Sequence, residues 1–118
     1  MQNTMDENRE ELLSLCHLVR ELIYLNKYEQ CSAAIAAAMG KYPNAPEPHN
    51  LFGVLYEKKG DHISAMRHFR AAWALDPTYI PARHNIDLYG SFYAKGKCAF
   101  DESDCSPINV SEHYVSKY

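Results

Sequence analysis

The chain has 118 residues and a mass of 13.5 kDa, enough for one small domain with a modest core. Apolar residues make up 47% and charged residues 23%, which argues against disorder along the whole chain. The formal charge is −3, with basic and acidic residues balanced up to Cys98, so nothing favours nucleic acid or an anionic membrane as a partner. The acidic, polar N-terminus does not resemble a signal peptide. We therefore expect a cytoplasmic protein whose four cysteines are thiols.

Two helices are expected in the first third of the chain. A capping-box pattern before an apolar run predicts that the first helix begins near Met5. Its apolar residues then recur at helical spacing until a short turn at Asn26 and Lys27. The second helix should run to about Met39, with Gly40 as a C-terminal cap.

Three more helices are expected after a break at prolines 43, 46 and 48, since proline is tolerated only in the first turn of a helix. Gly60 and Asp61 should separate the third and fourth helices, with Asp61 as an N-cap. Pro77 should end the fourth helix, and Pro81 should open the fifth. The expected fold is therefore all-α.

The chain also repeats itself with a period of 34 residues. Pro43 and Pro77 are separated by that distance, and the same shift places Leu18 on Phe52. A period of this length indicates stacked helix pairs, in which each repeat buries its apolar face against its neighbours.

Residues 46–79 resemble a tetratricopeptide repeat (TPR), whose pattern is W-x2-L-G-x2-Y, then A-x3-F, then P. The matching positions hold His49, Phe52, Gly53, Tyr56, Ala65, Phe69 and Pro77. Residues 12–45 form a weaker copy and residues 80–93 a partial one. The resemblance implies a right-handed α-solenoid of stacked antiparallel helix pairs within residues 1–94. Residues 95–118 would be a tail that either packs back on the helices or is disordered.

Gly53 and Ala65 are the small residues of this repeat, and we assign them one role. They lie where the two helices of a repeat come closest, while Tyr56 and Phe69 fill the space beside them. Cys31 takes the small position in the first helix pair, where a thiol packs as a small apolar group.

The resemblance implies a concave groove, lined by the first helix of each repeat, that binds a peptide or helix of a partner protein. The expected lining residues are Leu13, Cys16, Arg20, Tyr24, Glu47, Asn50, Val54, Glu57, Lys58, Pro81, His84, Leu88 and Phe92. Asn50 could bond to a peptide backbone, because its amide offers a donor and an acceptor. In an alternative interpretation, some of these residues pack against the chain's own tail.

One subtype of the family is not supported by the sequence. Carboxylate-clamp members hold an acidic tail with lysine, arginine and asparagine side chains on the groove helices. The corresponding places hold Cys16, Arg20, Leu51, Pro81 and Asn85, of which only Arg20 is cationic. Several cations are needed to pair with an acidic tail, so this subtype is excluded.

No catalytic motif is present, so we expect no enzyme activity, no cofactor and no metal. Cys98 and Cys105 flank an acidic stretch, and a metal or redox site there is the weaker alternative because their spacing fits no known motif. A second alternative is a self-assembling module, in which the tail and the terminal helix form a homodimer interface.

Overall fold

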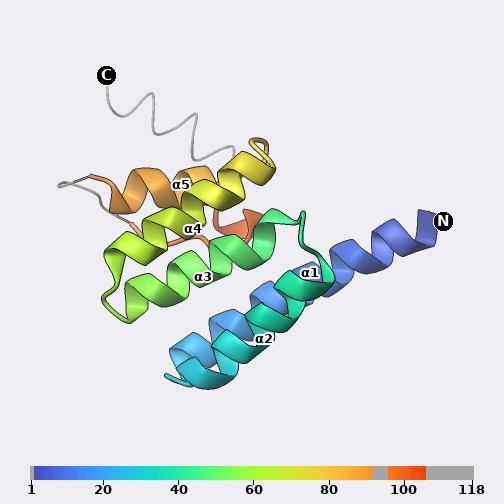
Figure 1. The fold of residues 1–118 in the computed structure, drawn as a ribbon, viewed down its shortest axis with the longest axis horizontal. Helices are drawn as coiled ribbons and strands as arrows, with labels where there is room; N and C mark the ends of the chain where they lie inside the picture. The colour runs from blue at the N-terminus through green and yellow to red at the C-terminus, as the bar shows by residue number, and fades with distance from the viewer. Residues whose placement is uncertain (1, 92–95, 106–118) are drawn as a thin grey trace.

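The computed structural model describes residues 2–91 and 96–105, with side chains from Glu7 onward. These residues form five α-helices and one 3₁₀ helix, and they contain no strand, so the all-α prediction is confirmed for this part of the chain (Figure 1). The helices are α1 (Gln2–Tyr24), α2 (Tyr28–Lys41), α3 (Pro46–Lys58), α4 (His62–Leu75), α5 (Ile80–Tyr89) and η1 (Glu102–Asp104). None of them is long and apolar enough to cross a membrane within the described ranges.

The turns between the helices follow from residues that favour them. Asn26, after α1, has a φ of 59°, a left-handed conformation that asparagine tolerates better than most residues. Gly60 has a φ of 85° between α3 and α4. The next residue, Asp61, accepts a hydrogen bond at 3.1 Å from the Ser64 backbone N–H, so its predicted N-cap role is confirmed.

Two helix ends differ from the predictions. The first helix begins at Gln2 instead of near Met5, and the second continues through Gly40 to Lys41. The extension of α2 has a tertiary cause. Lys41 and Tyr42 both bond to the Glu11 carboxylate of α1, at 2.6–2.8 Å, and these contacts hold the end of α2 against α1. The N-terminal part of α1 projects beyond α2 (Figure 1).

The helices form a sequential arrangement in which each contacts the next. In addition, α1 contacts α3, and α3 contacts α5. After α5, the chain returns along α3 and α5, and η1 contacts α5 (Figure 1). This arrangement gives α1, α3 and α5 a common side, on which residues 96–105 lie.

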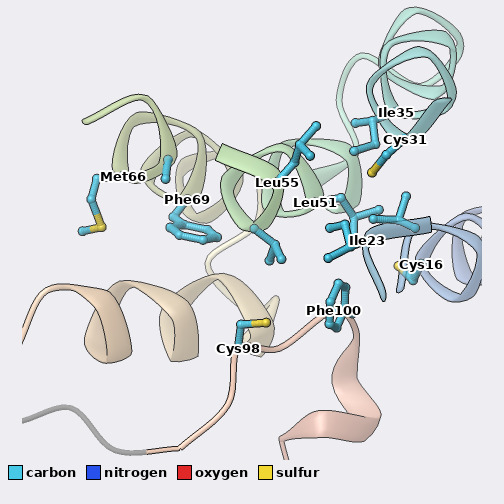
Figure 2. Packing of buried hydrophobic residues seen from close by; sticks show 13 residues of the cluster. Cys16, Ile23, Cys31, Ile35, Leu51, Leu55, Met66, Phe69, Cys98 and Phe100 are labelled. Carbon is cyan, nitrogen blue, oxygen red and sulfur yellow. The ribbon is translucent and has the colours of Figure 1, made fainter. Parts of the chain in front are cut away.

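One apolar cluster joins all five helices and residues 96–105. Its buried members include Val19, Ile35, Leu51 and Phe69 from successive helices, and Phe100 from the returning segment. Figure 2 shows Phe100 pointing toward the α1 and α3 side chains of this cluster. The segment therefore contributes to the core as well as to the surface of the common side.

The helices α3 and α4 approach each other closely at Gly53. A Cβ atom placed on Gly53 would lie 2.3 Å from the Phe69 ring, so only glycine fits there. Ala65 and Phe69 are both fully buried at this crossing. The small-residue role predicted for Gly53 is confirmed by this geometry.

Candidate functional site

The candidate site is the groove formed by α1, α3 and α5. Residues 96–105, which we call the groove segment, lie in it. Cys98, Ala99, Phe100 and Asp101 are buried there, whereas Gly96, Lys97, Glu102 and Ser103 are exposed. The segment is thus extended through the groove, with its centre enclosed and both flanks in water.

Two asparagines hold the backbone of the groove segment at Ala99. Asn50 Nδ2 donates to the Ala99 carbonyl at 3.0 Å, and Asn85 Nδ2 donates to the same oxygen at 2.8 Å. The Ala99 N–H donates to Asn85 Oδ1 at 2.8 Å, and Asn85 Nδ2 donates to Asn50 Oδ1 at 2.9 Å. We call Asn50 and Asn85 the asparagine clamp.

Burial makes the clamp sensitive to loss of its ligand. Asn50, Asn85 and Ala99 all have 0% exposure. Leaving a buried amide without a hydrogen-bond partner lowers the stability of the protein by about 1–3 kcal/mol, because no water replaces the lost bond. The clamp therefore stabilises the groove only when a peptide backbone lies between the two asparagines.

An ion pair between Arg20 and Asp104 holds the groove segment at a second place, after Ala99. Arg20 Nη2 lies 2.8 Å from Asp104 Oδ2, and Arg20 Nη1 lies 3.2 Å from Asp104 Oδ1, a bidentate geometry. Arg20 Nη2 is also 3.4 Å from Asp101 Oδ2. The Arg20 guanidinium carbon lies 4.7 Å from the centre of the Phe100 ring, a cation–π contact. Arg20 thus contacts one aromatic ring and two carboxylates of the segment.

The ionisation of Asp104 is coupled to this contact. Burial alone raises the pKa of this carboxyl, but hydrogen bonds from Arg20 and from the Phe100 and Asp101 backbone N–H groups outweigh burial and lower its pKa below the ordinary value. The same pair raises the pKa of Arg20, chiefly through the hydrogen bond to Asp104. The ion pair therefore persists until the pH falls below the usual aspartate range.

The groove segment fixes its own turn. Asp104 Oδ2 accepts hydrogen bonds from the backbone N–H groups of Phe100, at 2.9 Å, and Asp101, at 3.3 Å. Asp101 Oδ1 accepts from the Ser103 N–H at 2.8 Å and from the Ser103 hydroxyl. Together with η1, these bonds form a capping box that presents both aspartates to Arg20.

An open hollow of about 540 Å³ lies beside the segment. Its lining residues are Arg20, Lys58, Leu88, Tyr89, Gly96, Lys97, Cys98, Phe100 and Asp104. Burial raises the pKa of the Cys98 thiol, although a hydrogen bond from Tyr89 and the nearby charge of Lys58 oppose this effect. Tyr89 in turn stacks on Phe69, with ring centres 5.7 Å apart. Cys98 is one of the smaller side chains that border this hollow.

Several of the residues predicted to line the groove meet the groove segment. Asn50 and Arg20 bind it directly, and His84 Nε2 donates to the Lys97 carbonyl at 2.8 Å. Lys58 and Leu88 border the adjacent hollow.

For the other predicted groove residues, the structure gives no hydrogen bond to the groove segment among the described residues. Cys16 and Val54 are fully buried in the core, where burial raises the pKa of the Cys16 thiol to about 12. Tyr24 is 82% exposed. The Glu57 carboxylate is 2.6 Å from His62 Nδ1 on α4. Phe92 lies outside the described residues.

Sequence reasoning missed the role of Asn85 and the ligands supplied by the groove segment. A shift of 34 residues from Asn50 leads to His84, whereas the structure pairs Asn50 with the next residue, Asn85. Two asparagines 35 residues apart, one residue more than the repeat period, were a usable signal, because an asparagine buried on a helix needs a specific partner. The positions of the acidic residues of the segment in the sequence did not indicate which groove residue they would contact.

The cysteines and histidines form no disulfide and no metal site in the part of the chain that the structure describes. Its four cysteines are free, and no group of three or more potential ligands could hold a metal ion there. His49 and His68 form a pair between α3 and α4, with their Nδ1 atoms 3.2 Å apart. Burial lowers the pKa of both rings, and His49 further lowers that of His68.

The groove and its internal segment are therefore the best-defined candidate site of this chain. Comparisons with protein-family models, with curated proteins and with solved structures found no match.

Proposed function

We propose that this chain is a short TPR-like α-solenoid that binds an extended peptide of a partner protein in the groove. Three features support the solenoid: the 34-residue period, the contacts between consecutive helices, and the contacts of α1 with α3 and of α3 with α5. The proposal includes no catalytic step, no cofactor, and no nucleic-acid or membrane partner. It keeps the cytoplasmic location expected from the sequence.

The observation that carries the proposal is the asparagine clamp. Among the residues that the structure describes, its two fully buried side-chain amides bond to each other and to the backbone of Ala99. Every peptide has the same backbone groups, so the clamp suits any extended segment with a small residue at that place. In this conformation the chain's own segment occupies the clamp.

The test is a selection of peptides that bind the full chain from a random displayed library, followed by NMR titration with the enriched peptides. The side-chain amide signals of Asn50 and Asn85 should shift saturably, because the incoming backbone replaces that of Ala99. Asn44, exposed in the turn before α3, provides a matched signal that should not move. Failure to enrich any saturable peptide, or binding that leaves both clamp signals unchanged, would refute the proposal.

The homodimer built from the tail and the terminal helix stays an alternative prediction. The same titration distinguishes it, because a dimer of this kind makes the clamp signals depend on protein concentration alone.

A further inference from the structure

We infer that the partner peptide carries a small residue, an aromatic residue and two aspartates in the order found in Ala99, Phe100, Asp101 and Asp104, preceded by a large apolar residue. The groove segment would be an internal, weaker copy of that ligand. This inference rests on the proposed function, and it adds the sequence class of the peptide.

The small and aromatic positions follow from burial. Ala99 has 0% exposure and its backbone is bonded to both asparagines, so a longer side chain there would have to displace packed neighbours. Phe100 is 8% exposed, packs in the core cluster and lies under Arg20. An aromatic ring satisfies both neighbours at once, because its edge and face are apolar and its face attracts the cation.

The acidic positions follow from charge and from local geometry. Asp104 forms the bidentate pair with Arg20, and Asp101 lies 3.5 Å from His17 Nε2 as well as near Arg20. The turn that presents both carboxylates is made entirely by bonds within residues 100–104. A free peptide with the same residues can therefore form the same turn.

The occupant that replaces the groove segment must belong to a different protein. A second copy of this chain offers the identical segment, so it gains no contact over the internal one. It also lacks the advantage of linkage, which corresponds to an effective concentration of about millimolar. Only a peptide with additional contacts can displace the internal segment.

The hollow beside Cys98 supplies those additional contacts. It holds about 540 Å³ and is bordered by Leu88, Tyr89 and the exposed Lys58. Cys98 is too small to fill it. A large apolar side chain at that place would bury its surface against Leu88 and Tyr89.

The experiment measures fluorescence anisotropy with a labelled peptide of residues 96–105 in which serine replaces both cysteines. The receptors are the full wild-type chain and the full chain with Phe100→Ala and Asp104→Asn, which weaken the internal copy and leave the groove helices intact. We expect the probe to bind the double variant at least about tenfold more tightly than the wild type, because competition from the linked segment falls.

Three matched measurements assign that binding to the inferred contacts. A probe with alanine for the phenylalanine and asparagine for the second aspartate should no longer bind the double variant more tightly than the wild type. Arg20→Gln in the double variant should weaken the original probe. A probe with leucine at the place of Cys98 should bind about tenfold more tightly than the serine probe, through the added apolar burial. An Asn85→Ala variant is not suitable, since it weakens the internal and external peptides together.

The outcomes separate this inference from the proposed function. If library peptides move the clamp signals but the probe does not bind the folded double variant, the sequence class is wrong and the peptide-binding function stands. If neither binds, both are wrong. Should the double variant not fold, the wild-type chain titrated with millimolar leucine probe must show the Ala99 amide leaving the clamp, and an unchanged Ala99 signal overturns the inference.

Discussion

The α3–α4 hairpin and the groove are stabilised by different kinds of contact. At the Gly53 crossing of the hairpin, the Phe69 ring approaches the α3 backbone, and Ala65 and Phe69 make buried apolar contacts there. In the groove, Asn50, Asn85 and Arg20 hold a returning segment through directed hydrogen bonds and an ion pair. Apolar packing stabilises without selecting a sequence, whereas directed bonds require particular atoms at particular places. The hairpin is thus suited to maintain the fold, and the groove contacts hold one particular segment in a defined place.

The largest effect should come from emptying the hairpin core. Phe69→Ala should lower the free energy of unfolding by about 3–5 kcal/mol, from lost burial and the cavity that remains. Chemical denaturation measures the loss. Ile63→Ala on the same helix is the control, because Ile63 is 68% exposed and its change should stay within about 0.5 kcal/mol. Similar losses for both variants would contradict the assigned core.

The next effect tests the close approach itself. Gly53→Ala should cost about 1–3 kcal/mol of unfolding free energy, because the new methyl group would overlap the Phe69 ring. Combining it with Phe69→Leu should reduce that cost, which a double-mutant cycle measures. Gly40→Ala in α2 is the matched control. Nothing lies within 4 Å of that Cβ position, so this change should be neutral or slightly stabilising.

A third change should separate the groove from the hairpin. Asn85→Ala should accelerate hydrogen exchange at the Ala99 amide, because both backbone groups of Ala99 lose a partner. The free energy of local opening at that amide should fall by about 1–3 kcal/mol. Asn50→Ala should have a smaller effect, since Asn85 still bonds to both groups. Amides in α3 and α4 should keep most of their protection. Equal loss of protection in both regions would mean that the segment and the hairpin unfold as one unit.

The smallest effect is a pH dependence within the hairpin. Burial lowers the pKa of His49 and His68 below the usual 6.5, so the unfolded chain binds protons more readily than the folded chain. Stability should therefore be highest above pH 6.5 and decline as the pH falls from there toward the folded pKa. Thermal unfolding measured above and below pH 6.5 gives the size of this decline in stability. His49→Phe should make it shallower, and an unchanged slope would exclude this pair as its source.

Much of the fold was predictable because its signals are local. The helix count, the turn at Asn26, the N-cap at Asp61 and the small residue at Gly53 each depend on a few neighbouring residues or on one repeat period. Helix ends were less predictable where tertiary contacts act, as at Lys41. The candidate groove residue Asn50 was found from its place on the helix stripe and from the hydrogen-bonding capacity of its amide.

The sequence by itself determined which residues are helical, because backbone preferences and apolar spacing act over short distances. Tertiary structure decided what those helices enclose. The pairing of Asn50 with Asn85 and the seating of Ala99 between them depend on how α3 and α5 pack. The contact of Arg20 with Asp104 joins residues 84 positions apart, and no local rule relates them. Directed contacts of this kind are specified only when the packed helices fix the positions of their donors and acceptors.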